Sequence, residues 1–149
     1  MAFQTKITRA RFVVGLFSSE QMQTIGQAVT DSVAARIRRG MNVEDAPAKP
    51  LKPGRDGKRG YPDRKVAHGL QALRDWMWRG KTMRSLKVQS ANENRAVVAF
   101  VDPEADRIAH FNNKRERQFG MSPADRTVLK QAVNSTAKQA RIVRVERVS

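Results

Sequence analysis

The sequence predicts an α+β fold in which a long N-terminal helix and a C-terminal helix pack on a small antiparallel sheet. Three observations predict it. Apolar residues recur at three- and four-residue steps between Ser18 and Arg39, residues 95–101 read RAVVAFV, and a capped helix start stands at Ser122. The length of 149 residues suits a single domain.

The N-terminal helix is predicted to begin at a Ser18 or Ser19 cap and to end near Arg39. Glu20 lies in its first turn, where a negative charge interacts favourably with the helix dipole, and Gly40 stops it. Its apolar face consists of Met22, Ile25, Val29, Val33 and Ile37. Three arginines crowd its last turn, namely Arg36, Arg38 and Arg39.

Residues 40–63 are predicted to form a long loop rich in proline, glycine and lysine. Prolines forbid a helix there, and glycines at positions 54, 57 and 60 loosen the chain. A loop of this length is uncommon inside a domain and is usually functional or disordered. A second helix is expected from Arg64 to about Trp78. Its apolar side would be Val66, Leu70, Leu73 and Met77.

The centre of the chain predicts a hairpin. One strand is expected at residues 86–90, a polar turn at 91–94, and a second strand at 95–101 that is apolar on both faces and therefore central. Asp102 and Pro103 end that strand, and a short helix is expected from Glu104 to about Phe111. Ser122 then caps the last helix, with Asp125 completing a capping box.

These elements divide the single domain into three parts. Residues 1–17 are expected to form an N-terminal arm or strand, and residues 18–137 the α+β core that contains loop 40–63. Residues 138–149 alternate loosely and are expected to form a C-terminal strand or arm.

The charge of the chain points to a polyanionic or acidic partner. Lys and Arg number 29 against 14 Asp and Glu, which gives a formal net charge of +15. There are no cysteines, so disulfides and thiolate metal sites are excluded. No apolar run is long enough to span a bilayer, and we expect no membrane partner and synthesis in the cytoplasm.

No motif predicts catalysis, and we expect the protein not to be an enzyme. Arg79-Gly80-Lys81-Thr82 resembles the end of a phosphate-binding loop, but Asp75 stands where that loop needs a glycine. His68 and His110 lie far apart in sequence and form no metal-binding pattern. We therefore predict no catalytic, cofactor-binding or metal-binding residue.

The candidate functional residues are basic and aromatic. The basic residues expected to face a partner or DNA lie in two loops and are Lys49, Lys52, Arg55, Lys58, Arg59, Arg64, Lys65, Lys114, Arg115 and Arg117. Trp76 and Trp78 cannot share one helical face, so one is expected in the core and the other at a boundary or an interface.

Three short patterns follow one another in a defined order. The first, a turn before a strand, consists of Gly80, Met83, Ser85 and Leu86. The second consists of Ala105, Ala109, Phe111, Asn112 and Asn113. The third, before the last helix, consists of Phe119, Gly120, Met121, Ser122 and Asp125. In this order they resemble the virion-morphogenesis (tail-completion, head-tail joining) proteins of tailed bacteriophages, over roughly residues 18–135.

The resemblance implies a structural subunit of the phage neck or tail. Such a subunit would assemble with itself into a ring, a hexamer or a dodecamer, against adjacent neck and tail proteins. DNA would pass through the lumen, the protein would reside in the virion after synthesis in the host cytoplasm, and no cofactor is implied.

The residues alone also fit a second hypothesis, a basic nucleic-acid-binding module that grips phosphates nonspecifically through the same loops. Few aromatics accompany the basic residues, which disfavours base-specific recognition. Whether the basic loops face DNA or an acidic protein stays open at this point.

Overall fold

The computed structural model describes residues 17–77 and 80–146 and confirms the α+β class. Its elements, in order, are α1 (Ser19–Arg38), α2 (Tyr61–Ala67), α3 (Lys81–Arg84), β1 (Leu86–Asn92), β2 (Arg95–Phe100), α4 (Pro103–Arg115) and α5 (Pro123–Glu146). The N-terminal arm or strand predicted for residues 1–17 lies, apart from Phe17, outside the described residues.

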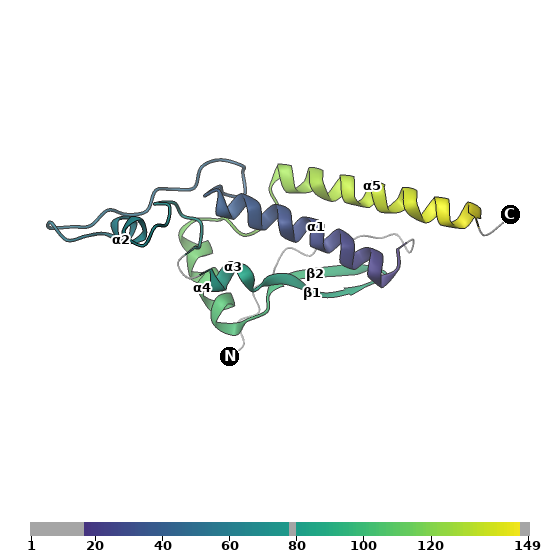
Figure 1. Cartoon of the computed structure of the whole chain (residues 1–149), viewed down its shortest axis with the longest axis horizontal. Helices are drawn as coiled ribbons and strands as arrows, with labels where there is room; N and C mark the ends of the chain where they lie inside the picture. The colour runs from purple at the N-terminus through teal and green to yellow at the C-terminus, as the bar shows by residue number, and fades with distance from the viewer. Residues whose placement is uncertain (1–16, 78–79, 147–149) are drawn as a thin grey trace.

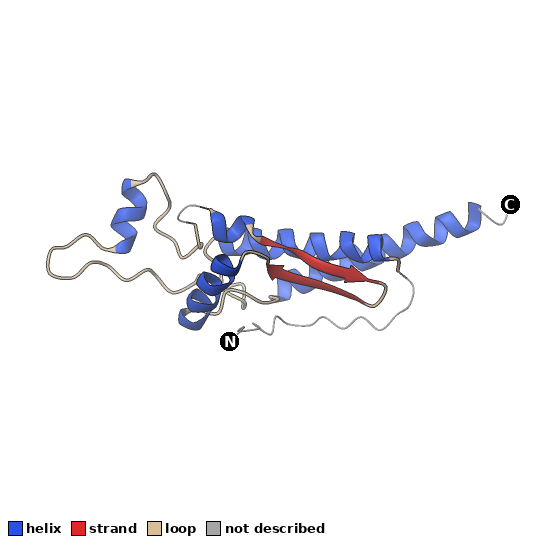
Figure 2. Ribbon diagram, turned by 90° about the horizontal axis from the view of Figure 1, so that it is seen from below, coloured by secondary structure: helices blue, strands red, loops and turns tan. Residues whose placement is uncertain are grey.

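The body of the molecule has three layers. Helix α1 lies in the middle, with α5 on one side and the β1–β2 hairpin on the other (Figure 1). The view in Figure 2 shows the hairpin running along the helices. The sheet therefore packs on α1, and α5 packs on the opposite face of the same helix.

Helix α1 forms as its sequence predicts. The Ser18 hydroxyl accepts a hydrogen bond from the Gln21 amide at 3.2 Å, and the Gln21 side chain accepts one from the Ser18 amide at 2.8 Å. This capping box satisfies two donors at the helix start. The five predicted apolar residues are all buried, and Gly40, at φ +69°, ends the helix in the left-handed conformation.

The hairpin is antiparallel, as predicted, and pairs Leu86 with Phe100 and Asn92 with Arg95. One residue, Gln89, is inserted in β1 between Val88 and Ser90, which makes a β-bulge. The prediction of a central second strand is wrong for the described residues, because among them the sheet has two strands and each is an edge. Ala99 and Phe100 at the end of β2 are buried, residues 96–98 are half-buried, and α1 packs against the sheet.

The close contact between α1 and the hairpin depends on a glycine. A Cβ atom on Gly26 would lie 3.1 Å from the Val88 side chain and 3.2 Å from that of Ala96. The absence of a side chain at this position lets the helix axis approach the sheet.

The second predicted helix, 64–78, is wrong in both position and length. Helix α2 begins at Tyr61, with Pro62 in its first turn, where a missing N–H removes no helical hydrogen bond. Asp63 accepts a hydrogen bond from the Gly60 amide at 2.7 Å and so fixes the helix start. The proline that argued against a helix thus initiates one, and the loop ends at Gly60 instead of residue 63.

Helix α2 ends at Ala67, well before the predicted Trp78. Gly69 and Trp76 both adopt positive φ angles, +71° and +57°, which no right-handed helix can accommodate. The expected apolar side of this helix is not buried as a face, because Val66 is 60% exposed and Leu73 is 41% exposed. Residues 68–77 instead return to the body as irregular chain.

The second half of the chain is more helical than predicted. Asp102 caps α4 by accepting from the Ala105 amide at 2.9 Å, and the helix continues to Arg115 instead of ending near Phe111. The capping box predicted at α5 is confirmed, since Ser122 and Asp125 exchange hydrogen bonds at 3.0 and 3.1 Å. A strand or an arm was predicted for residues 138–149; the strand is wrong through Glu146, because α5 continues to that residue.

The core centres on an aromatic group. Phe100 at the end of β2 lies 5.8 Å from the Trp76 ring and 5.0 Å from the Phe119 ring, measured between centroids. Apolar residues of α1, α3, β1 and α4 complete this cluster. A second cluster surrounds Phe17, Met22 and Ile25 at the other end of α1. Within the described residues, no helix is long and apolar enough to cross a membrane.

Candidate interaction surface

Residues 48–75, called the basic arm below, project from the end of the body opposite to the C-terminal end of α5 (Figures 1 and 2). The arm consists of a loop, helix α2 and the returning chain. The side chains of Lys52, Arg55, Lys58 and Arg59 in its loop are exposed, as is Arg64 on α2. These residues were predicted to face a partner or DNA; their exposure makes them accessible, and the partner stays a prediction.

Lys65 does not belong to that exposed set. Its side chain is 1% exposed and forms an ion pair with Asp75, which is itself 5% exposed. The Lys65 ammonium also donates to the Leu73 carbonyl at 2.6 Å. The prediction that Lys65 faces a partner is therefore wrong, and its role is to tie α2 to the returning chain.

Replacing Lys65 by methionine is expected to loosen the basic arm. The change leaves Asp75 buried without its cation, which typically costs about 3–5 kcal/mol. Because the pair lies within the arm, we expect faster amide hydrogen exchange in residues 61–75 and little change in α1. Arg64→Met, at the exposed neighbour on α2, is the control. Equal exchange in the two variants would contradict the role assigned to Lys65.

The base of the arm is fixed by Arg74. Its Nε donates to the Lys49 carbonyl at 3.0 Å, and its second terminal nitrogen donates to the Pro50 carbonyl at 3.4 Å. The chain leaving the body and the chain returning to it are thereby joined. Arg74 was not among the residues that the sequence predicted as functional.

A groove of about 870 Å³ lies between the base of the arm and helix α4. Its apolar and aromatic lining residues, called the floor here, are Pro50, Leu51, Tyr61, Leu73, Trp76 and Ile108. Its charged lining residues are Lys49, Lys52, Lys65, Arg74 and Arg115, and no acidic residue of the described chain lines it. This volume falls in the range of pockets that hold ligands.

The rim of the groove is cationic. The Lys49 side chain is 79% exposed and lies 3.8 Å from a Glu116 carboxylate oxygen. Lys52 and Arg115 are exposed, and neither is ion-paired with any residue of the described chain. The groove thus brings together residues that the sequence prediction placed in two separate loops.

Two predicted basic residues, Lys114 and Arg117, lie outside the groove. Lys114 and Arg115 occupy the last turn of α4 and not a loop, because that helix is longer than predicted. Lys114 lines a separate cavity of about 140 Å³ beside Phe100 and His110. Arg117 is exposed in the linker between α4 and α5, and its carbonyl accepts from the Val43 amide at 3.0 Å.

Both tryptophans were candidate interface residues, with one expected in the core and the other at a boundary or an interface, and for Trp76 the interface role is wrong. Trp76 is the core residue, with 8% of its surface exposed, and its indole nitrogen donates to the Gln118 side chain at 2.8 Å. That hydrogen bond and its contact with Phe100 hold the left-handed backbone at this position. Trp78 lies outside the described residues.

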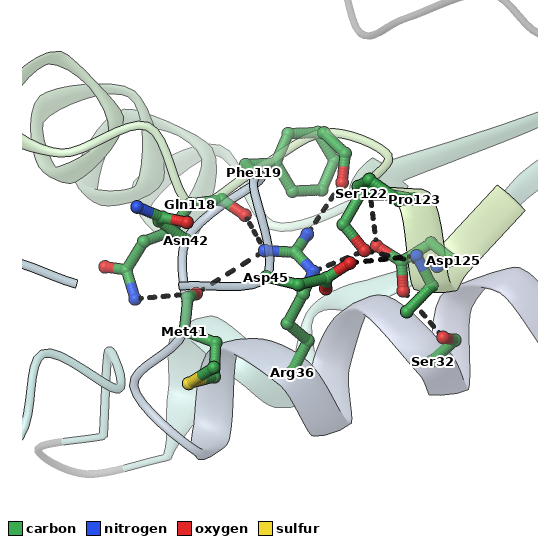
Figure 3. Close-up of polar contacts among 12 residues, drawn as sticks. Ser32, Arg36, Met41, Asn42, Asp45, Gln118, Phe119, Ser122, Pro123 and Asp125 are labelled. Atoms are coloured by element: carbon green, nitrogen blue, oxygen red, sulfur yellow. Dashed lines mark hydrogen bonds and ion pairs between the residues drawn. The ribbon is translucent and has the colours of Figure 1, made fainter. Parts of the chain in front are cut away.

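A buried polar cluster joins α1, α5 and the linker between α4 and α5 (Figure 3). Arg36, which is 1% exposed on α1, pairs with Asp125 of α5 at a distance of 2.9 Å. Its other nitrogens donate to the carbonyls of Gln118 and Gly120 at 2.9 and 2.7 Å. Ser32 donates to the second Asp125 oxygen at 2.6 Å. Both charged groups are therefore paired and hydrogen-bonded.

Gln118 extends this cluster to the basic arm. Its side chain is fully buried, accepts from Trp76, and donates to the carbonyls of Arg74 and Met41. Its backbone amide donates to the Asn113 side chain of α4 at 2.9 Å. One amide side chain thus connects the end of the arm, the chain after α1 and the linker before α5.

Asp45 holds the start of the long loop against α5. Its carboxylate accepts from the Ala124 amide at 2.9 Å, at the first turn of the helix. Hydrogen bonds from the Ser122 hydroxyl and from the Ala124 amide lower the pKa of Asp45 below its ordinary value of 3.8. The carboxylate is therefore ionised at neutral pH, where it complements the positive end of the helix dipole.

The sequence contained an indication that Arg36 is buried, but it was overlooked because arginines are also common at the C-terminal ends of helices. Arg36 lies three residues after Val33, on the apolar face of α1, and a cation at such a position predicts a buried acidic partner. No comparable signal existed for Gln118 or Arg74, because their partners are backbone carbonyls of residues distant in sequence.

The described residues contain no group of three or more histidine and acidic side chains placed to bind a metal ion. The chain matches no protein-family model, no curated protein and no solved structure. The candidate interaction surface is therefore described from its own residues. It consists of the exposed basic arm and the apolar groove at the base of that arm.

Proposed function

We propose that the chain is a structural subunit of a bacteriophage neck or tail that assembles into a ring through which DNA passes. The observation that carries the proposal is the basic arm, which extends away from the three-layered body (Figure 1). A projecting arm is useful to a protein that contacts neighbouring subunits, because it reaches surfaces that the body cannot. The resemblance of the ordered sequence patterns to tail-completion proteins supplies the biological setting.

Exposed apolar residues support a partner for the arm. Tyr61, Val66 and Leu73 are 43%, 60% and 41% exposed, and all three belong to the arm. Large apolar side chains gathered on one exposed region are typical of interaction sites. Phe111, which is 57% exposed on α4, adds to the apolar surface of the chain.

The hairpin supports assembly for a different reason. Among the described residues each of its two strands has one edge without a partner strand. A strand edge presents unpaired N–H and C=O groups that can pair with a strand of another subunit. A neighbour that extended this sheet would bury edges that are otherwise exposed.

The charge supports contact with DNA in the lumen. The formal net charge of +15 attracts phosphate, and exposed cations at the arm loop are available for such contacts. Adjacent neck and tail proteins are the other expected neighbours. In this proposal the protein acts in the virion after synthesis in the host cytoplasm, and it performs no catalysis.

The proposal is tested by the assembly state of the full chain. Light scattering after size-exclusion chromatography and negative-stain electron microscopy are expected to show closed rings, hexamers or dodecamers. Val66→Asp, which places a charge on the exposed apolar part of α2, is expected to yield folded monomers, whereas the Arg64→Ser control should still form rings. A chain that is monomeric at its highest soluble concentration and absent from purified tailed particles would contradict the proposal.

The exposed cations of the arm also favour a second candidate, a nucleic-acid-binding module. It predicts tight binding of duplex DNA by the isolated monomer and a steep loss of affinity as the salt concentration rises. Rings with weak DNA binding and a shallow salt dependence would support the first candidate. Tight, salt-sensitive binding by a monomer that forms no ring would support the second.

A further inference from the structure

We propose that the groove at the base of the basic arm binds a short acidic segment of a partner protein, with apolar side chains seated on its floor and carboxylates on its rim. This goes beyond ring assembly, since a monomer of the chain contains the whole groove. The proposal therefore stands or fails separately from the proposed function.

Charge complementarity identifies the occupant as acidic. The groove is lined by several cations and by no acidic side chain. Lys52 and Arg115 lie on its two sides, one from the arm and one from the end of α4, and the described chain provides neither with an acidic partner. A segment lying between them would place carboxylates within reach of both, and Arg could bind one in bidentate geometry.

The floor identifies the occupant as a protein segment and not as nucleic acid. Leu51, Leu73 and Ile108 are aliphatic, and Tyr61 is the exposed aromatic residue of the floor, so a nucleic acid would find a single ring there and not the several stacking platforms that hold successive bases. The Trp76 ring is 8% exposed and packs against Phe100, so it is committed to the core. Aliphatic floors of this kind accommodate leucine, methionine or phenylalanine side chains as anchors.

A second copy of this chain fits the groove poorly. The segment before α1 contains Lys6, Arg9 and Arg11 and no acidic residue. A cationic segment of this kind would be repelled by Lys49, Lys52 and Arg115.

The groove is held in shape before any partner arrives. Arg74 joins Lys49 and Pro50 to the returning chain, and the buried pair of Lys65 and Asp75 fixes α2 beside it. Binding therefore needs little ordering of the groove, which lowers the entropic cost of association.

The experiment is selection from a displayed library of random twelve-residue peptides on the full-length chain. Peptides that combine Asp or Glu with Leu, Met or Phe are expected to be enriched. The affinity of the most enriched peptide is then measured by fluorescence anisotropy with wild-type chain and with variants.

Two double variants distinguish binding in the groove from nonspecific attraction by the net charge of the chain. The double change Lys52→Glu and Arg115→Glu is expected to weaken binding of that peptide about tenfold or more, because it reverses both rim charges. The control, Lys58→Glu and Arg59→Glu, alters the net charge equally but lies outside the groove. It is expected to change affinity by less than about twofold, since distant exposed charges are screened by salt.

The floor is tested by Ile108→Ser, a change of a residue that is 39% exposed on α4. It is expected to weaken binding about fivefold, through loss of buried apolar area, without unfolding the chain. The proposal is overturned if the library yields no acidic–apolar consensus, if the two double variants weaken binding equally, or if duplex DNA is bound in the groove in preference to the peptide.

Discussion

Replacing Arg36 by methionine is expected to lower the free energy of unfolding by about 3–5 kcal/mol, the usual cost of breaking a buried ion pair from one side. Asp125 would remain 1% exposed with no cation beside it. The carbonyls of Gln118 and Gly120 would lose their donor as well. The loss should appear as a lower midpoint in urea with an unchanged slope.

Arg38→Met is the matched control for this prediction. Arg38 lies in the same helical turn but is exposed, so its loss removes only a weak surface interaction. The double change Arg36→Met and Asp125→Asn should cost less than the sum of its single changes, because no uncompensated charge remains. An Arg36→Met chain as stable as the Arg38→Met chain would show that the buried pair contributes nothing.

Replacing Phe100 by aspartate is expected to unfold the protein. Phe100 is 6% exposed and contacts both Trp76 and Phe119, so the change removes an aromatic ring and buries a charge. Loss of the ring alone costs about 3–5 kcal/mol, and an unpaired buried carboxylate adds several more. This total is comparable to the whole stability of a typical domain.

The neighbouring position provides the control for Phe100. Val101 is 45% exposed just after β2, so Val101→Asp places the same charge in water and should leave the fold intact. Near-ultraviolet circular dichroism, which reports the packing of Trp76, distinguishes the two outcomes. A soluble Phe100→Asp chain with a native spectrum would contradict the central position of Phe100 in the core.

The elements that sequence reasoning placed correctly are those whose signals are local. Helix α1 has a capping box, a regular apolar face and a glycine stop within one continuous stretch. The start of α5 has the reciprocal hydrogen bonds of Ser122 and Asp125. Such signals need no knowledge of what the element packs against, and this is why they were reliable.

The elements that were misplaced depend on contacts distant in sequence. Trp76 adopts a left-handed conformation, and its ring contacts Gln118 and Phe100. Both partners lie outside residues 64–78, so the sequence of that segment could not indicate these contacts. Helical spacing of Val66 and Leu73 therefore predicted a helix that the tertiary structure overrides. At the C-terminus, loose alternation from residue 138 predicted a strand or an arm, whereas the helix that begins at Pro123 continues to Glu146.

The candidate site shows the same division. The exposed cations of the arm were predictable, because a loop rich in proline and glycine lies at the surface and its lysines and arginines face water. The burial of Lys65 was not predictable, because it depends on the ion pair with Asp75, which forms only when the returning chain lies beside α2. The groove was not predictable either, since it forms where the arm meets α4.

Arg36 and Gln118 together connect the basic arm mechanically to helix α1. Gln118 binds the Arg74 carbonyl at the end of the basic arm and the Met41 carbonyl in the chain after α1, and Arg36 binds the backbone of the linker that contains Gln118. A force that pulls on the arm would therefore pass through side chains directly to α1, the central layer. Strain applied by a neighbour at the tip would be borne by the whole body instead of unravelling the chain locally.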